Sequence, residues 1–335
     1  MHNKQGVFAA SIIGASGYSG QETLDRVLGH PGLELVALGS DSLTGEPATA
    51  LDPRLARNGH RLPAFTTNAE ALAAAADVIF LCLEHERAAE LEPPSAAVVV
   101  DLSGGHRLQD AAAYDTWYGF THPHPETLGE WSYAVPELYP PAGRLIANPG
   151  CYATAAILAL GPIAGAVDQA SVVVDAKSGV SGAGRTLRES SHAAQVLENV
   201  TPYRVGTHQH SAEIEQALGF PVCFVPHLIP VRRGLIATCY ANATAQGLRG
   251  LLEAAYAKHA AVHVLPEGGV PELSRVQGGD EAEIGLFEDR ATGRAIVVCA
   301  IDNLGKGAAG QAIQNANLAL GLPETTGLRL HGVLV

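Results

Sequence analysis

The chain has 335 residues, of which 47% are hydrophobic and 16% are charged, so it has ample apolar material for two packed domains and does not resemble a disordered chain. Its formal net charge is −13 and its basic residues form no stripe, which argues against nucleic acid as a partner, because that binding depends on neutralising phosphates. No apolar run approaches the ~20 residues that a membrane span needs. The first apolar stretch, residues 7–13, leads into a glycine turn rather than a cleavage site. We therefore expect a cytoplasmic protein with no nucleic-acid or membrane partner.

The first half of the chain alternates strand-like and helix-like segments. Four apolar runs of strand length and two helical patterns follow one another, at 7–13 (strand), 19–29 (helix), 33–38 (strand), 69–76 (helix), 77–83 (strand) and 96–102 (strand). The run at 98–102 shows no polar alternation, which is typical of a strand covered on both faces. This order predicts an α/β fold with a Rossmann-like, doubly wound parallel sheet.

The composition changes around residues 140–149, where we expect a second domain to begin. An apolar helix at 152–160 is followed by alternating strand-like segments at 171–176, 222–226, 235–241 and 295–301. This pattern predicts an α+β domain, with a mixed or largely antiparallel sheet, that serves catalysis and dimerisation. The last helical segment, near 308–320, could return to the first domain. The expected domains are therefore 1–149 with 306–335, and 150–305.

A glycine-rich turn joins the first strand to the first helix, and its residues are Gly14, Ala15, Ser16, Gly17, Tyr18, Ser19 and Gly20. Gly14 permits the tight turn, Gly17 lets the backbone approach a pyrophosphate, and Gly20 lets the helix lie close to the sheet. Free N–H groups at the start of the helix would then face the phosphates. The turn predicts a dinucleotide site, and the alternative is a purely structural turn.

The residues after the second strand lie where recognition of the adenosine ribose is expected. Asp41 would favour the free 2′-hydroxyl of NAD and would repel the 2′-phosphate of NADP. Ser40, Ser42 and Thr44 could instead form hydrogen bonds with that phosphate. These residues alone leave the choice between the two dinucleotides open.

Cys151 differs from the other four cysteines, which fall inside strand-like runs and behave as small buried hydrophobes. It follows Gly150 and begins an apolar helix, where the helix dipole and unpaired N–H groups favour a thiolate. The same N–H groups could hold the oxyanion that forms when a thiolate attacks an acyl carbon. Cys151 is therefore a candidate nucleophile, with a helix-cap cysteine as the alternative.

A thiol nucleophile needs a proton partner, and His208-Gln209-His210, followed by Glu213, is the most compact candidate. If this segment is extended, His208 and His210 project to the same face and could enter one cleft. A two-histidine metal site and a polar loop are the alternatives. No third ligand has convincing spacing, so no metal is expected.

Together these motifs resemble the N-acetyl-γ-glutamyl-phosphate reductase family, which is related to the aspartate-semialdehyde dehydrogenases. Besides the glycine turn, the motifs appear in family order up to about residue 320, as Asp101-Leu-Ser103, Asn148-Pro-Gly-Cys-Tyr152, Ala176-Lys-Ser-Gly-Val-Ser-Gly-Ala-Gly-Arg185, His208-Gln-His210, Arg233-Gly-Leu-Ile-Ala-Thr238 and Asp302-Asn-Leu-Gly-Lys-Gly307. The resemblance implies NADPH-dependent reduction of N-acetyl-γ-glutamyl phosphate to the semialdehyde, through a Cys thioester, in arginine biosynthesis. It also implies a homodimer or homotetramer.

The resemblance further implies roles for single residues. Cys151 would be the nucleophile and His210, or His208, the acid–base group. Substrate phosphate and carboxylate would be bound by a set comprising Arg107, Arg185 and Ser178, since guanidinium groups suit both anions. The dinucleotide would be bound by Gly14, Ser16, Gly17, Tyr18, Ser19, Gly20, Ser40, Asp41 and Ser42, with Asn303 at the nicotinamide end.

Three positions depart from the family pattern. Relatives commonly carry Leu-Pro-His-Gly where this chain has Leu83-Glu84-His85-Glu86-Arg87, a loop near the nicotinamide. Gly104-Gly105-His106 stands where Ala-Asp-Phe usually precedes the arginine. An arginine that often follows the serine at position 40 is Asp41 here. The family uses NADP, so NADP is expected and NAD is the alternative.

Three other functions share parts of this pattern. A reductase of carrier-protein-linked aminoadipyl or glutamyl phosphate would share every motif and differ in the substrate cleft. Aspartate-semialdehyde dehydrogenase itself is disfavoured, because its cysteine lies in an Asn-Cys-Thr or Asn-Cys-Ser setting rather than beside Gly150 and Tyr152. A non-catalytic dinucleotide-sensing protein would have no need of a thiol where a helix begins.

Overall fold

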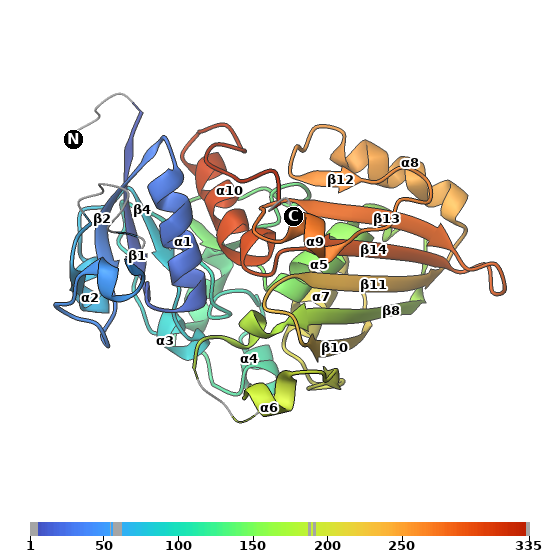
Figure 1. Cartoon of the computed structure of the whole chain (residues 1–335), viewed down its shortest axis with the longest axis horizontal. Helices are drawn as coiled ribbons and strands as arrows, with labels where there is room; N and C mark the ends of the chain where they lie inside the picture. The colour runs from blue at the N-terminus through green and yellow to red at the C-terminus, as the bar shows by residue number, and fades with distance from the viewer. Residues whose placement is uncertain (1–5, 54, 56–61, 187–188, 190–191, 333–335) are drawn as a thin grey trace.

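The computed structural model describes residues 6–53, 55, 62–186, 189 and 192–332. The chain forms two sheets, each packed with helices, and the two lie side by side (Figure 1). Within the described residues, no helix combines the length and the apolar character needed to cross a membrane.

The first sheet has seven strands in the order β3-β2-β1-β4-β5-β7-β6, and every neighbouring pair is parallel. Its strands are β1 (Phe8–Ile13), β2 (Leu33–Gly39), β3 (Phe65–Thr66), β4 (Val78–Leu81), β5 (Val98–Asp101), β6 (Ser132–Tyr133) and β7 (Leu145–Ala147). The central strands are buried on both faces, as their unbroken apolar runs predict. Strand order reverses between β1 and β4, and ligands of such sheets bind at the carboxyl ends of the strands at this point. The predicted Rossmann-like fold is confirmed.

Short helices connect these strands, namely α1 (Tyr18–Gly29), α2 (Asn68–Leu72), α3 (His85–Ala89) and α4 (Ala112–Trp117), with 3₁₀ turns at Ala48–Ala50 and Pro125–Glu130. α1 begins one residue earlier than predicted. α2 is shorter than predicted: it ends at Leu72, although Ala73–Ala76 favour helix by propensity.

The second sheet is mixed, with the order β12-β13-β14-β11-β8-β10-β9. Its strands are β8 (Asp168–Gly179), β9 (Thr201–Pro202), β10 (Cys223–Ile229), β11 (Leu235–Asn242), β12 (Val262–Val264), β13 (Ala282–Glu288) and β14 (Ala295–Ile301). β8, β11, β14 and β13 form an antiparallel run, while β10 pairs parallel to β8 and β12 pairs parallel to β13. The predicted α+β domain is confirmed.

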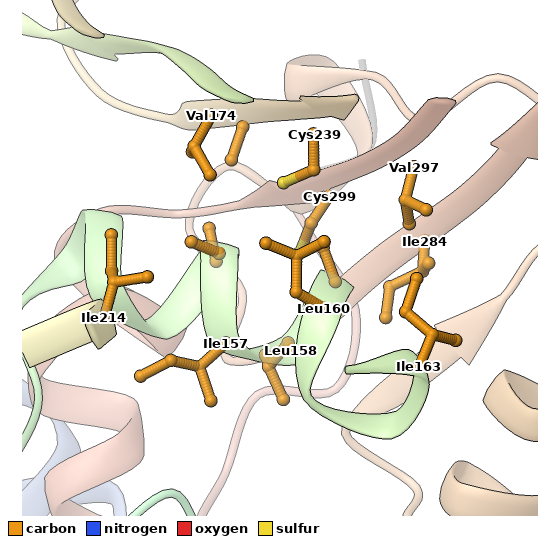
Figure 2. Packing of buried hydrophobic residues seen from close by; sticks show 14 of the residues in the cluster. Ile157, Leu158, Leu160, Ile163, Val174, Ile214, Cys239, Ile284, Val297 and Cys299 are labelled. Carbon is orange, nitrogen blue, oxygen red and sulfur yellow. The ribbon is translucent and has the colours of Figure 1, made fainter. Parts of the chain in front are cut away.

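One face of this sheet is covered by helices. These are α5 (Cys151–Leu160), α7 (His210–Leu218) and α8 (Ala245–Tyr256), while α6 (Ala193–Val196) and α9 (Leu273–Val276) are single turns. α5 is apolar on all sides and is buried from Tyr152 to Leu160, as expected for a helix inside a core. Figure 2 shows Leu160 pointing toward Cys239 and Cys299 of the sheet, while Ile157 lies on the other side of α5 within the same core. α5 is therefore fixed by hydrophobic packing, which holds its first residue, Cys151, in place.

The last helix returns to the first sheet. A π-helical turn, Gly305–Ala309, leads into α10 (Gly310–Ala319). Ala312, Ile313 and Ala316 join the core that contains residues of β1, and Figure 1 shows α10 beside α1. The predicted return is confirmed.

Two expectations about local structure are wrong. Cys223 is exposed rather than buried, because it is the first residue of β10, and Cys82 lies just beyond the end of β4. The segment His208–His210 is not extended, because His210 begins α7 and Ser211 N–H donates to the His208 carbonyl. Its two imidazoles nevertheless lie close together, with ring centres 4.6 Å apart.

Candidate active site

The glycine turn has the shape that a dinucleotide needs. Gly14 has φ +76°, and a Cβ there would lie 2.4 Å from the Cys82 carbonyl oxygen. A Cβ on Gly20 would lie 2.5 Å from the Gly14 carbonyl oxygen, so this glycine lets α1 approach the turn. At Gly17 the nearest protein atom to such a Cβ is 3.6 Å away, so packing within the protein does not require a glycine there. The open space at Gly17, before the uncapped start of α1, fits a pyrophosphate.

Serine hydroxyls connect this turn to the end of β2. Ser40 Oγ donates to Ser16 Oγ at 2.9 Å, and Ser42 Oγ lies 3.3 Å from Ser40 Oγ. Tyr18 and Ser19 form the first turn of α1, where Tyr18 is exposed. The structure thus brings the predicted phosphate and ribose residues to one edge of the sheet.

Cys151 lies where the two domains meet. Asn148 follows β7 at the carboxyl edge of the first sheet, and its N–H donates to the Asp101 carbonyl at the end of β5. Gly150 is the N-cap of α5 and has no side chain to cap the first N–H groups. The π-helical turn packs against the thiol residue, because a Cβ on Gly307 would lie 2.8 Å from Cys151 Cβ. π-helical turns occur frequently at functional sites.

His210 packs directly against the residue before the cysteine. A Cβ on Gly150 would lie 2.2 Å from His210 Nε2, so only glycine leaves room for this imidazole. His210 Nδ1 is buried and has no hydrogen-bond partner among the described residues. His208 Nδ1 instead accepts from the His210 N–H at 3.1 Å. A buried, unpaired ring nitrogen is unusual, and it makes His210 rather than His208 the better candidate for proton transfer.

Glu213 gathers the surrounding polar groups. Its carboxylate is fully buried and accepts from Arg107 Nη1 and Tyr118 OH, both at 3.0 Å. It also accepts from Tyr133 OH at 3.2 Å and from the Gly150 N–H at 2.9 Å. The carboxylate therefore fixes the position of Gly150 and, through it, the start of α5.

Arg107 is a buried part of this network rather than a surface residue. Its Nε donates to the Asn148 carbonyl at 2.8 Å and its Nη2 to the Leu102 carbonyl at 2.7 Å, in addition to the contact with Glu213. Burial opposes the positive charge, but Glu213 outweighs that effect and raises the pKa of Arg107. A guanidinium has five N–H donors, so two remain for a bound anion.

The electrostatics of the thiol differ from the sequence expectation. Burial raises the pKa of Cys151 to about 11, although Arg107 and the Tyr152 N–H act in the opposite direction. Burial and Arg107 hold the pKa of His210 well below its usual range, and burial lowers that of His208 to about 2. The helix dipole that favours a thiolate is therefore outweighed by desolvation. In the free protein, the thiol and the imidazole are both neutral near pH 7.

The remaining predicted site residues come from three places, with Ser178 near the end of β8, Arg185 on the segment after β8 and Asn303 just after β14. Ser178 is buried and Asn303 donates to Ser181 Oγ at 2.9 Å, while its Oδ1 accepts from the Gly234 N–H. Arg185 is exposed, and its Nη1 donates to the Ser16 carbonyl at 2.7 Å. Arg185 thus spans from the second domain to the glycine turn of the first.

Sequence reasoning missed several members of this site. In the sequence, Glu213 and Gly307 appear only as parts of motifs, and nothing marks Tyr118 or Tyr133. The one available signal was the spacing of His210 and Glu213, which are three residues apart and share a face of α7. The tyrosines come from distant segments and have no local signal.

No set of three or more His, Cys, Asp or Glu side chains in the described residues could hold a metal ion. Glu213 and Arg107 instead form hydrogen bonds with each other and with neighbouring groups.

Two family models match the chain. The NAD-binding domain of semialdehyde dehydrogenases matches residues 9–145, and the semialdehyde dehydrogenase dimerisation domain matches residues 151–303.

Close relatives carry one name. N-acetyl-γ-glutamyl-phosphate reductases from Salinispora tropica and Acidothermus cellulolyticus are each 44% identical over 96% of this chain and 98% of their own. That of Paracoccus denitrificans is 40% identical over 96% of this chain and 97% of its own.

Similar solved structures are aspartate-semialdehyde dehydrogenases. The Vibrio cholerae enzyme II, complexed with ASA, has a TM-score of 0.70 at 18% identity and covers 95% of this chain and 99% of its own. The Candida albicans enzyme with NADP has a TM-score of 0.59 at 16% identity, with coverage of 94% and 99%. At these identities the likeness concerns the fold.

Proposed function

Because the chain belongs to the N-acetyl-γ-glutamyl-phosphate reductase family of semialdehyde dehydrogenases, we propose that it reduces N-acetyl-γ-glutamyl phosphate to N-acetylglutamate semialdehyde and inorganic phosphate, a step of arginine biosynthesis. One observation carries this proposal. A thiol begins a buried helix whose first N–H groups are uncapped, beside an imidazole with an unpaired nitrogen, at the carboxyl edge of a dinucleotide-binding sheet.

The first half of the reaction is acyl transfer to sulfur. His210 takes the proton of Cys151, and the sulfur attacks the γ-acyl carbon, so that a C–S bond forms and the bond from carbon to the phosphate oxygen breaks. Inorganic phosphate leaves and a thioester remains. N–H groups in the first turn of α5 stabilise the oxyanion of the tetrahedral intermediate. The neutral His210 of the free protein is the form that can accept this proton.

The second half is reduction of the thioester. A nicotinamide dinucleotide held by the glycine turn and the end of β2 would supply the hydride that this reduction needs. The same N–H groups hold the new oxyanion, which re-forms the carbonyl as the C–S bond breaks and the aldehyde leaves. The protonated His210 then returns its proton to the sulfur of Cys151, so the thiol is restored.

Substrate anions would be bound by residues around this pocket. Arg107 has two free N–H donors, with which it would bind one of the two anionic groups of the substrate, the phosphate or the carboxylate. We assign Arg185 and Ser178 to the other anion, although Arg185 would have to leave the Ser16 carbonyl to reach it. His208 positions His210 through the His210 N–H rather than acting on substrate.

The dinucleotide-binding residues that we assign are those of the glycine turn and of the end of β2, with Asn303 toward the nicotinamide. NADPH is the donor that the resemblance implies, and Asp41 is the residue that keeps NADH as the alternative. The solved neighbour from Candida albicans, which binds NADP, supports a nicotinamide dinucleotide in this fold.

The second sheet supports a homo-oligomer. Along β11 buried residues alternate with half-buried ones, among them Ile236, Thr238 and Tyr240, on the face opposite to α5. We propose that a second copy covers this face in a homodimer, which could pair further into a homotetramer. Light scattering coupled to gel filtration tests this, and a monomer at micromolar concentration contradicts it. We place the enzyme in the cytoplasm.

The test of the reaction runs in the reverse direction. Phosphate-dependent reduction of NADP or NAD by N-acetylglutamate semialdehyde should be abolished by Cys151→Ser, while the Kd for the dinucleotide stays within about twofold. Near-normal turnover of this variant contradicts a thioester. Turnover with a carrier-linked semialdehyde alone would instead identify the carrier-dependent reductase, and dinucleotide binding without any turnover would identify a sensing protein.

A further inference from the structure

A cavity of about 460 Å³ opens at the carboxyl edge of the first sheet, between α2 and α3. Leu72, Leu83 and Leu91 contribute apolar walls, and Asp41 lies at the end of β2 where the adenosine ribose is recognised in dinucleotide folds. An apolar slot with a few polar groups is typical of a site for a planar base. The cavity therefore suits the adenosine half of the dinucleotide.

The polar side of this cavity is predominantly acidic. Asp41, Glu90 and Glu92 line it, and among the described lining residues Arg87 is the one cation. Arg87 Nη2 lies 3.6 Å from Asp41 Oδ2, and the two side chains are 63% and 46% exposed. Arg87 thus lies close to the ribose position rather than near the nicotinamide, where the family pattern places its loop, and its exposed, loosely paired side chain is free to turn toward a ligand.

Asp41, in contrast, is held in place. Its Oδ1 accepts from the Asn68 N–H at 2.9 Å and its Oδ2 from Asn68 Nδ2 at 2.8 Å. Asn68 Oδ1 in turn accepts from the Gly14 N–H of the glycine turn. The negative charge of Asp41 therefore stays beside the ribose when a ligand enters.

The hydroxyls near the ribose are less available. Ser40 Oγ donates to Ser16 Oγ, and Thr44 Oγ1 donates to the Ser40 carbonyl. A 2′-phosphate carries up to two negative charges and needs a cation, which hydroxyls do not supply. Arg87 provides that cation, and its planar donors match phosphate oxygens.

We propose that Arg87 binds the 2′-phosphate of NADPH, that Asp41 competes with this phosphate for Arg87, and that the pair sets the choice between NADPH and NADH. This inference rests on the proposed function in treating the cavity as the adenosine end of the hydride donor's site. When the residue that follows β2 is basic, it can bind the 2′-phosphate itself. In this chain that residue is Asp41, which competes with the phosphate, and Arg87 binds the phosphate instead.

Equilibrium binding without any acyl substrate tests the proposal. The Kd values of NADPH and NADH are measured by nucleotide fluorescence for the wild type and for Arg87→Ala, Arg87→Lys and Asp41→Asn. Arg87→Ala should raise the Kd of NADPH about tenfold or more, because a charge-assisted contact is lost. It should change the Kd of NADH less than about twofold. Arg87→Lys should restore part of the loss. Asp41→Asn should lower the Kd of NADPH several-fold.

Two controls separate charge at the ribose from other causes. Arg249→Ala removes one positive charge from α8 in the other domain and should change neither Kd. Adenosine 2′,5′-bisphosphate and 5′-AMP are measured as competitors. Binding of the bisphosphate should weaken in Arg87→Ala as binding of NADPH does, and binding of 5′-AMP should be as little affected as that of NADH.

Either of two results overturns the inference. One is an Arg87→Ala variant, folded by circular dichroism, that leaves the NADPH to NADH ratio unchanged. The other is an Asp41→Asn variant that does not favour NADPH. Failure of the proposed reaction would look different, because both dinucleotides would bind as expected while no aldehyde was turned over.

Discussion

The two ends of the candidate site are built in opposite ways. Around Cys151 the charged groups are buried, and Glu213 pairs with Arg107 and also accepts from the backbone N–H of Gly150. At the ribose end the charged groups are exposed and only one, Asp41, is fixed. The acyl end is thus assembled before substrate arrives, which suits chemistry that needs accurate placement. The ribose end recognises its ligand by charge, which tolerates a mobile side chain.

The difference also decides how each end responds to mutation. At the buried end, a lost partner leaves an unsatisfied charge or displaces a catalytic group. At the exposed end, solvent replaces a lost partner at little cost.

Gly150→Ala should have the largest effect. Gly150 has φ −70°, so alanine fits the backbone, but its Cβ would lie 2.2 Å from His210 Nε2 and would push the imidazole aside. We expect kcat/KM to fall about 10²–10³-fold, the scale set by loss of a positioned acid–base group. The measurement is the phosphate-dependent aldehyde assay.

Gly250→Ala is the matched control for that variant. A Cβ on Gly250, in the middle of α8, meets no atom within 4 Å, so activity should be unchanged and stability should rise by about 0.5–1 kcal/mol. Full activity of Gly150→Ala would show that the position of His210 is not essential.

Glu213→Gln should have the next largest effect, on stability. The glutamine keeps the shape of the side chain but leaves the buried Arg107 cation without its counter-ion. We expect the free energy of unfolding to fall by about 3 kcal/mol, the usual cost of breaking a buried ion pair from one side. Urea denaturation measures it.

Glu215→Gln, on the same helix but half-buried, is the control. It should change the free energy of unfolding by less than about 0.5 kcal/mol. Equal losses in the two variants would indicate a general effect on α7 rather than the loss of the Glu213–Arg107 pair.

The sequence indicates that the glycine turn and the end of β2 lie together, but it does not predict Arg87 beside Asp41 or the network around Glu213. The glycine turn and Asp41 belong to one local β-α-β unit, whose spacing is fixed by the chain itself. The network around Glu213 joins Tyr118, Tyr133 and Arg107, which folding brings together from distant segments. Burial also reversed the expected charge of the Cys151 thiol, because helix position can be inferred from sequence but the extent of desolvation cannot. The domain boundaries and the assigned roles of the site residues stay predictions.

Arg87→Ala should have the smallest effect on stability, although it changes dinucleotide choice. The pair with Asp41 is exposed and its N–O distance is 3.6 Å, so it contributes little beyond what water would supply. We expect the free energy of unfolding to change by less than about 0.5 kcal/mol without ligand. Saturating NADPH should stabilise the wild type more than the variant, because tighter binding to the folded state raises stability further. Thermal denaturation with and without NADPH measures both effects. If Arg87→Ala without ligand lowered the free energy of unfolding as much as Glu213→Gln does, Arg87 would have a structural role. The contrast between the two ends of the site would then fail.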